Sequence, residues 1–283
     1  MRNVDPGARV RAVAIMEIWK AILVGVVQGL SEFLPISSSG HIALTQFLLG
    51  MREVGVEPKE DITFELVLHL GTFLSVVIYF WNKLWAMFLS LFQKERVEDR
   101  KMILWLILAT VPATVAYVLF KDFFEGAYND PVKVSAFLLV TGVILLLPKV
   151  YRAKEQEKFG WRGALAMGVA QAFAILPGIS RSGSTITAGL MAGVKPDKAA
   201  EFSFLMFLPA IGGGTLLKAK NLMDVAQGSS ALAYGCGFVA SFLSGVLAVY
   251  LVMSAIRKGK LQLFAYYCFA VGIAGLIYFS QGG

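Results

Sequence analysis

Long apolar runs dominate this chain, and short polar stretches separate them. A helix needs about 20 apolar residues to cross the hydrocarbon core of a bilayer. Six runs reach roughly that length, and they cover residues 62–81, 102–120, 132–148, 199–217, 232–256 and 262–280. The pattern therefore predicts six transmembrane helices.

Two further apolar stretches, residues 17–50 and 160–194, are interrupted near their middle by a proline and a Ser/Gly cluster. Pro35 and Pro177 each remove a helical hydrogen bond and disfavour helix at the preceding residue. We expect each stretch to break into two short helices that form a re-entrant hairpin. Such breaks at membrane depth are tolerated only inside the protein or beside a polar cavity.

The two interrupted stretches carry the same pattern. Five residues of the first recur in the second without gaps: Gln28, Ile36, Ser37, Ser39 and Gly40 correspond to Gln171, Ile179, Ser180, Ser182 and Gly183. Three predicted spans separate the hairpins, and this odd number inverts the second copy. The predicted fold is thus an all-α polytopic membrane protein with an inverted-topology repeat, each half a re-entrant hairpin plus three transmembrane helices. Its single membrane domain, 1–283, divides into an N-terminal tail (1–16), a first repeat (17–148) and a second repeat (160–281), and repeats of this kind form sites where they meet.

Composition agrees with a membrane protein. Hydrophobic residues make up 57% of the chain and charged residues 16%, with a mean hydropathy of +0.68, so a soluble globule is excluded. The net charge of +7 arises largely from loops beside the predicted spans, which indicates anionic lipid headgroups rather than nucleic acid as the partner. Basic residues concentrate around 83–101, 149–162 and 257–260, and this bias places those loops in the cytoplasm.

Ionisable residues inside apolar segments are costly and mark function by default. Such residues are Glu32, His41, Glu65, His69, Arg181 and Glu201, and they include both histidines of the chain. Gln28 and Glu32 share one helix face, while Ser38 and His41 share the first turn after the break. Arg181 replaces Ser38 in the second hairpin. For the Glu65–His69 pair a structural role and a site role stay equally open, and Glu201 is nearer to structural.

The hairpins offer the chemistry of a phosphate site. Helix N-termini bind anions through free backbone N–H groups, and a guanidinium matches phosphate oxygens. We expect the phosphate-binding residues to include Ser37, Ser39, Gly40, Ser180, Ser182 and Gly183. The carboxylate of Glu32 would repel a phosphate group. We therefore expect a divalent cation, Mg²⁺ or Ca²⁺, to bridge the carboxylate and the phosphate, with Glu32 and Gln28 as its protein ligands.

At these residues the chain resembles the bacterial undecaprenyl-diphosphate phosphatase family of the bacitracin-resistance type. The similarity lies in a Gln28-x-x-x-Glu32 element, a segment with Pro35, Ser37, Ser38, Gly40 and His41, and a later segment with Pro177, Gly178, Ser180, Arg181, Ser182 and Thr185. The resemblance implies Glu32 as acid/base or cation ligand, Ser38 and His41 near the reacting phosphorus, and Arg181 on phosphate oxygens. It adds Thr185 to the expected phosphate-binding set. Gln28 departs from the glutamate that many members have, and it is a weaker cation ligand.

The resemblance also implies an activity and a location. The activity is hydrolysis of undecaprenyl diphosphate to the monophosphate, which recycles the lipid carrier for cell-wall peptidoglycan synthesis and confers bacitracin resistance. The location is the plasma membrane, with the site facing the outer side. Expected partners are the isoprenyl diphosphate lipid and membrane lipids, with a homodimer as an open option.

Two alternatives remain at the level of sequence. The nucleophile is Ser38 activated by His41, His41 itself, or a water deprotonated by Glu32 or His41. The rival function is a flippase of an isoprenyl phosphate lipid, because inverted repeats with broken helices are also a transporter architecture.

Overall fold

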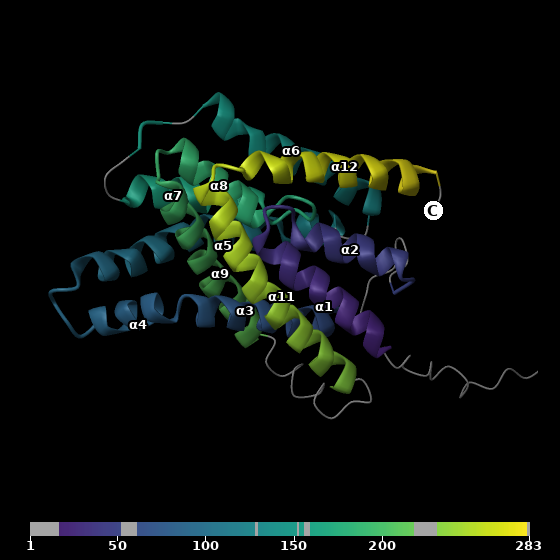
Figure 1. Ribbon diagram of the computed structural model, residues 1–283, viewed down its shortest axis with the longest axis horizontal. Coiled ribbons are helices and arrows are strands. Elements are labelled where there is room, and N and C mark those ends of the chain that lie inside the picture. Colours follow the sequence, from purple (N-terminus) through teal and green to yellow (C-terminus); the bar gives the residue numbers. More distant parts are fainter. Residues whose placement is uncertain are drawn as a thin grey trace, which may run out of the picture.

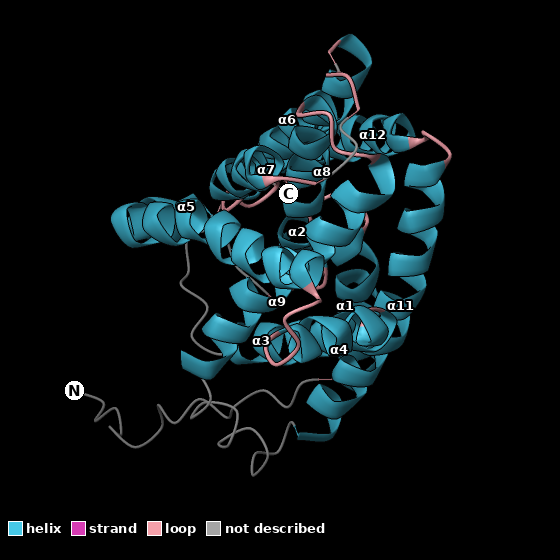
Figure 2. Ribbon diagram, turned by 90° about the vertical axis from the view of Figure 1, so that its left-hand side faces the viewer, coloured by secondary structure: helices cyan, strands magenta, loops and turns pink. Residues whose placement is uncertain are grey.

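The structure, a computed structural model, describes residues 17–51, 61–127, 130–151, 153–155, 159–217 and 231–281. The tail 1–16 lies outside the described residues. Within the described ranges the chain is helical and contains no strand, as Figure 1 and Figure 2 show. The helices in chain order are α1 (Ile18–Phe33), α2 (Ser38–Leu48), α3 (Asp61–Tyr79), α4 (Trp81–Ser90), α5 (Val97–Ala127), α6 (Pro131–Val150), α7 (Trp161–Phe173), α8 (Arg181–Met191), α9 (Pro196–Leu217), α11 (Ala231–Arg257) and α12 (Leu261–Ser280).

Several of these helices are long and apolar enough to span a membrane. Among the described residues four qualify singly: Val97–Lys121, Pro131–Val150, Ala231–Arg257 and Leu261–Ser280. A fifth span results if α3 and α4, which meet at a bend of 75°, are taken together. The remaining expected segment, 199–217, is helical within α9. The chain is therefore a multi-pass helical membrane protein, as predicted, while the number six, the domain limits and the inverted orientation of the repeats stay predictions.

Both interrupted stretches break where the sequence indicates. The first helix of one hairpin ends at Phe33 and the next begins at Ser38, and the corresponding ends of the other are Phe173 and Arg181. The predicted short helix pairs are thus present as α1–α2 and α7–α8.

Close helix contacts hold the first helix of each hairpin. In Figure 1, α1 and α11 run side by side, and a side chain at Gly25 would collide with the backbone oxygen of Gly237. The repeat-related Gly168 on α7 lies equally close to Ala109 of α5. Small residues allow such approach between membrane helices. The first helix of each hairpin therefore packs against a helix of the other predicted repeat: α1 against α11, and α7 against α5.

The largest apolar cluster connects α1 to α9. The ring of Phe33 meets Phe204 edge-on at 5.4 Å and Phe207 at 5.8 Å between centroids, and all three side chains are buried. Edge-to-face aromatic pairs of this kind have a defined geometry. Because Phe33 follows Glu32 directly, this packing fixes the end of α1 next to α9.

Candidate active site

The two hairpin breaks use one capping device. The hydroxyl of Ser37 accepts a hydrogen bond from the backbone N–H of Gly40 at 3.3 Å, and Ser180 accepts one from Gly183 at 3.0 Å. Serine is a preferred residue at this position because it satisfies an otherwise unpaired N–H. The first helical residue after each cap, Ser38 in one hairpin and Arg181 in the other, consequently takes an equivalent place.

The two breaks also meet in space. A Cβ atom on Gly40 would lie 3.1 Å from the Cα of Gly178, and Ser182 donates a hydrogen bond to the carbonyl of Leu34 at 3.3 Å. Thr141 of α6 holds the second loop, because its hydroxyl donates to the Gly178 carbonyl at 2.7 Å and accepts from the Ser180 N–H at 2.9 Å. These contacts bring the two loops together, as the sequence predicts, and a single site formed by both loops stays a prediction.

Glu32 lies at the centre of the polar cluster and is buried. Its Oε1 accepts a hydrogen bond from Nη2 of Arg181 at 2.6 Å, across the two hairpins. Its Oε2 accepts from the Ser38 hydroxyl at 2.6 Å and from Nε2 of Gln28 at 3.1 Å. A buried charge is tolerated when it is paired and hydrogen-bonded in this way. The carboxylate thus contacts both a hydroxyl that could attack and a cation that could bind phosphate.

Arg181 is held by α9 as well as by Glu32. Its Nη1 donates to the carbonyl of Ser203 at 3.1 Å, and its guanidinium carbon lies 4.8 Å from the centroid of the Phe207 ring. The hydroxyls of Ser203 and Thr185 are 2.6 Å apart, and Thr185 also donates to the Arg181 carbonyl at 2.8 Å. Thr185 therefore links the backbone of Arg181 to Ser203 on α9. The aromatic contact, a cation–π interaction, further fixes the plane of the guanidinium.

His41 faces a different partner from the one its spacing indicated. Its Nδ1 donates to the Ser37 carbonyl at 2.8 Å, and its Nε2 lies 3.0 Å from the hydroxyl of Tyr267 on α12. The His41 and Tyr267 rings stack at 5.5 Å with an interplanar angle of 13°. In this arrangement the Ser38 hydroxyl donates a hydrogen bond to the carboxylate of Glu32 and not to the imidazole of His41.

His69 joins the site from α3. Its Nδ1 donates to the backbone carbonyl of Glu65 at 2.8 Å, and its Nε2 lies 3.7 Å from Oε2 of Glu32. The site role left open for His69 thus has a contact in its favour. Glu201 instead pairs with Lys198 of its own helix at 2.8 Å, which agrees with a structural role.

Sequence reasoning missed two residues that touch the site, Tyr267 and Phe207. Both lie in apolar spans far along the chain from their partners, and a single aromatic residue in such a span carries no pattern. Only the packing of α9 and α12 against the hairpins reveals them.

The expected cation site can be tested against these contacts. Both oxygens of Glu32 already accept hydrogen bonds, and Gln28 presents its N–H₂ group while its oxygen is buried with no partner in the described part of the protein. The described residues also contain no group of three His, Cys, Asp or Glu side chains placed to hold a metal. As placed, these side chains do not form a cation site, and the divalent cation stays a prediction.

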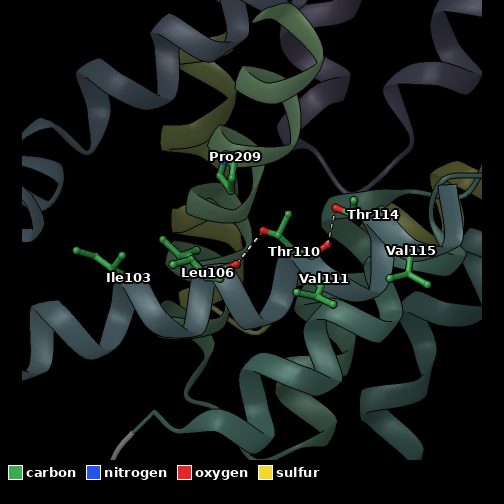
Figure 3. A pocket seen from close by; sticks show the side chains of 8 residues that line it. Ile103, Leu106, Thr110, Val111, Thr114, Val115 and Pro209 are labelled. Carbon is green, nitrogen blue, oxygen red and sulfur yellow. Dashed lines mark hydrogen bonds between the residues drawn. The ribbon is translucent and has the colours of Figure 1, made fainter. Parts of the chain in front are cut away.

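A separate apolar groove of about 470 Å³ lies between α5 and α9 (Figure 3). Its lining residues are Ile103, Leu106, Ile107, Thr110, Val111, Thr114, Val115 and Pro209. The two threonine hydroxyls donate to carbonyls of their own helix, at 2.8 Å and 3.0 Å, so their hydrogens are not available to a ligand. This groove lacks the charged groups that phosphate chemistry requires, and the candidate active site is the Glu32–Arg181 cluster.

Fold and site together define a multi-pass helical membrane protein in which buried Glu32 contacts the partly buried Arg181 and Ser38 where two broken helical hairpins meet. The chain matches the family described as Bacitracin resistance protein BacA over residues 21–274, and it belongs to that family. It is similar to the undecaprenyl-diphosphatase of Salinibacter ruber, with 42% identity over 275 residues that cover 92% of this chain and 99% of the relative. The undecaprenyl-diphosphatase of Halothermothrix orenii is 40% identical over 93% of this chain and 98% of its own length. That of Syntrophotalea carbinolica is 42% identical over 91% of this chain and 97% of its own length.

Proposed function

We propose that this chain hydrolyses undecaprenyl diphosphate to undecaprenyl phosphate and inorganic phosphate. The observation that carries the proposal is the set of direct contacts around Glu32: one oxygen meets the Ser38 hydroxyl and the other meets the Arg181 guanidinium, each at 2.6 Å. A nucleophile, its base and a phosphate-binding cation are therefore assembled before substrate arrives. The relatives named undecaprenyl-diphosphatase support the same reaction.

Binding of the diphosphate falls to the second hairpin and the helix ends. Arg181 offers planar N–H donors to the oxygens of the terminal phosphate, and the N-termini of α2 and α8 add backbone N–H groups. Phosphoryl transfer depends chiefly on positioning and on neutralising oxygen charge. The hold of α9 on Arg181, through Ser203 and Phe207, supplies that positioning.

The first chemical step is assigned to Ser38. Its oxygen attacks the terminal phosphorus while its proton passes to Oε2 of Glu32, and the bridging P–O bond breaks to release undecaprenyl phosphate. Water then attacks the phosphoserine. Glu32 returns its proton to the departing Ser38 oxygen, one water proton stays on the phosphate, and the other leaves through Nε2 of His41 to solvent. Attack by water directly on the lipid, or by His41, remains the alternative route.

The cellular setting completes the proposal. The enzyme resides in the plasma membrane with its site open to the outer side, opposite the basic loops, and it recycles the lipid carrier for cell-wall synthesis. A homodimer and a bound divalent cation belong to the proposal as predictions. Chemical cross-linking in native membranes checks the first, and the EDTA comparison below checks the second.

Phosphate release from undecaprenyl diphosphate by the purified protein in detergent tests the function. Detergent offers no second compartment, so an enzyme releases phosphate whereas a pure flippase releases none. Parallel reactions with EDTA report on the cation, and C15 diphosphate reports on chain length. Absence of phosphate release from every diphosphate, with and without added Mg²⁺ or Ca²⁺, would contradict the proposal.

A further inference from the structure

His41 has only one nitrogen available for proton exchange. The carbonyl of Ser37 can only accept, so the hydrogen on Nδ1 of His41 is committed to it at 2.8 Å. The neutral ring then carries its lone pair on Nε2. Any proton that the imidazole takes up or releases during turnover must pass through that second nitrogen.

The hydroxyl of Tyr267 occupies this nitrogen. It lies 3.0 Å from Nε2, within hydrogen-bonding distance, and it is the donor because a neutral Nε2 can only accept. The two rings are also nearly parallel, 13° apart, with their centroids at 5.5 Å. Hydrogen bonds at both nitrogens and a stacked ring thus fix the tautomer and the plane of the imidazole.

Residues next to Tyr267 fix it against the first hairpin. The neighbouring Cys268 is buried, and its sulfur lies 3.9 Å from the carbonyl of Pro35, at the break between α1 and α2. Farther along α12, Gly272 and Gly275 pack closely against Ser135 of α6. Tyr267 itself is 44% exposed, and within the described residues its hydroxyl is hydrogen-bonded to His41 and not to a core residue. Removing that hydroxyl should therefore leave the packing of α12 unchanged.

We infer that Tyr267 is a positioning residue for the phosphatase reaction: its hydroxyl orients His41 by donating a hydrogen bond to neutral Nε2 and by rotating to accept one when Nε2 is protonated. The expected effect on kcat rests on the proposed function, whereas the hydrogen bond between Tyr267 and His41 does not depend on that function. Among the described residues, no hydrogen bond links Tyr267 to Ser38 or Arg181. Tyr267 therefore acts through His41.

The kinetic test replaces Tyr267 with phenylalanine, which keeps the ring and removes only the hydroxyl. We expect Tyr267→Phe to lower kcat for phosphate release about fivefold to tenfold, the effect of losing one neutral hydrogen bond, with KM changed less than about twofold. The matched control is Tyr266→Phe, one residue away on α12 and 56% exposed, which should behave as wild type. In a His41→Ala background, Tyr267→Phe should cause no further loss, since contacting residues that act as one unit are not additive. Equal kcat values in Tyr267→Phe and Tyr266→Phe would overturn the inference. So would a Tyr267→Phe change that lowers kcat as much in the His41→Ala background as in the wild-type protein.

A spectroscopic test separates this inference from the proposed function. The chain has only two histidines, so protein labelled with ¹⁵N-histidine gives few ring-nitrogen signals, and His69→Gln assigns them. Tyr267→Phe should shift the Nε2 signal of His41 and leave His69 unchanged, whether or not the protein releases phosphate. An unchanged His41 signal would refute the contact, whereas failure of the wild-type protein to release phosphate would count against the proposed function alone.

Discussion

The two hairpins share a serine cap and differ in the residue that follows it. Ser37 and Ser180 cap their helices in the same manner, and the hydroxyl contacts Ser37–Ser39 and Ser180–Ser182 both measure 3.3 Å. After the cap, however, the first hairpin continues with Ser38 and the second with Arg181. The two hairpins therefore have matching caps, and they differ at the next residue, where the proposed function assigns a nucleophile to one hairpin and a phosphate-binding arginine to the other.

Backbone strain distinguishes the hairpins further. Ser37 has φ = 73°, a left-handed conformation that side chains disfavour, whereas its counterpart Ser180 has φ = −71°. In the second loop the positive φ falls on Gly178, where it costs little. Strain of this kind, about 1–3 kcal/mol per residue, gathers at functional sites. Here it aims the Ser37 carbonyl at both the backbone N–H and the Nδ1 of His41, at 3.1 Å and 2.8 Å.

Removal of the Ser38 hydroxyl, the proposed nucleophile, should have the largest effect on activity. We expect Ser38→Ala to lower phosphate release about 1000-fold or more, as loss of a nucleophile does in other hydrolases. Rapid quenching with labelled diphosphate should trap phosphate on the wild-type chain and none on the variant. Ser31→Ala is the matched control, since the Ser31 hydroxyl donates to the Val27 carbonyl within α1. A Ser38→Ala enzyme with wild-type turnover would instead assign the attack to water or His41.

Removal of Arg181, the proposed phosphate-binding residue, should have the second-largest effect on activity. Arg181→Ala should lower kcat/KM about 100-fold to 1000-fold, the usual cost of losing a charge-stabilising donor. Arg181→Lys should recover only part, because lysine cannot bridge Glu32 and phosphate with a planar fork. Arg162→Ala, at the start of α7 where the guanidinium carbon of Arg162 lies 5.5 Å from the centroid of the Trp161 ring, removes the same charge away from the site and should retain activity. The assignment fails if purified Arg181→Ala releases phosphate at the wild-type rate.

Much of this comparison could be predicted from the sequence, because it rests on local signals. Prolines at 35 and 177, the serine caps and the repeat itself are short-range features, and they led to the two breaks and to the meeting of Glu32 with Arg181. The bend of 75° between α3 and α4 was not predicted, since residues 79–83 contain no proline or glycine.

The contacts that sequence could not predict are those made by distant spans. His41 lies 226 positions from Tyr267 along the chain, and which face of α12 meets the hairpin depends on helix packing. Spacing within the first helical turn favoured a Ser38–His41 pair, but Ser38 bonds to Glu32 because the break brings the end of α1 beside the start of α2. Local periodicity describes one helix, whereas a site between several helices depends on how they pack.

Pushing the hairpins apart should have an intermediate effect. The Cβ of Gly40→Ala would lie 3.1 Å from the Cα of Gly178 and 3.4 Å from its nitrogen, and backbone atoms cannot rotate away. A shift of a few tenths of an ångström would lengthen the Glu32–Arg181 contact, and we expect about a tenfold loss of kcat because catalysis is sensitive to such displacement. Gly235→Ala on α11, where the added methyl group meets open space, should keep full activity. Wild-type kcat in Gly40→Ala would show that the hairpins tolerate separation.

The smallest effect is expected at a feature that serves both hairpins alike. α6 packs against both α2 and α8, and its N-cap Asp130 accepts hydrogen bonds from the backbone N–H groups of Val132 at 3.0 Å and Lys133 at 3.1 Å. Asp130→Ala should lower the free energy of unfolding by about 1 kcal/mol. It should leave kcat unchanged, because the cap lies at the start of α6 and is not one of the residues assigned to the reaction. Thermal unfolding in detergent measures the first quantity and phosphate release the second.

The pH dependence of that cap gives the sign of its contribution. Partial burial opposes the charge of Asp130, but the N–H and ammonium groups of Lys133 and the N–H of Val132 outweigh it and lower the pKa of the carboxyl below its usual value. A carboxyl with a lowered pKa in the folded state stabilises the protein above its unfolded pKa, and this stabilisation is lost as the pH falls through the folded pKa. The stability difference between wild type and Asp130→Asn, which keeps an acceptor but has no charge, should therefore shrink on acidification from neutral pH. A difference that stays constant from neutral to strongly acidic pH would show that the cap acts without its charge.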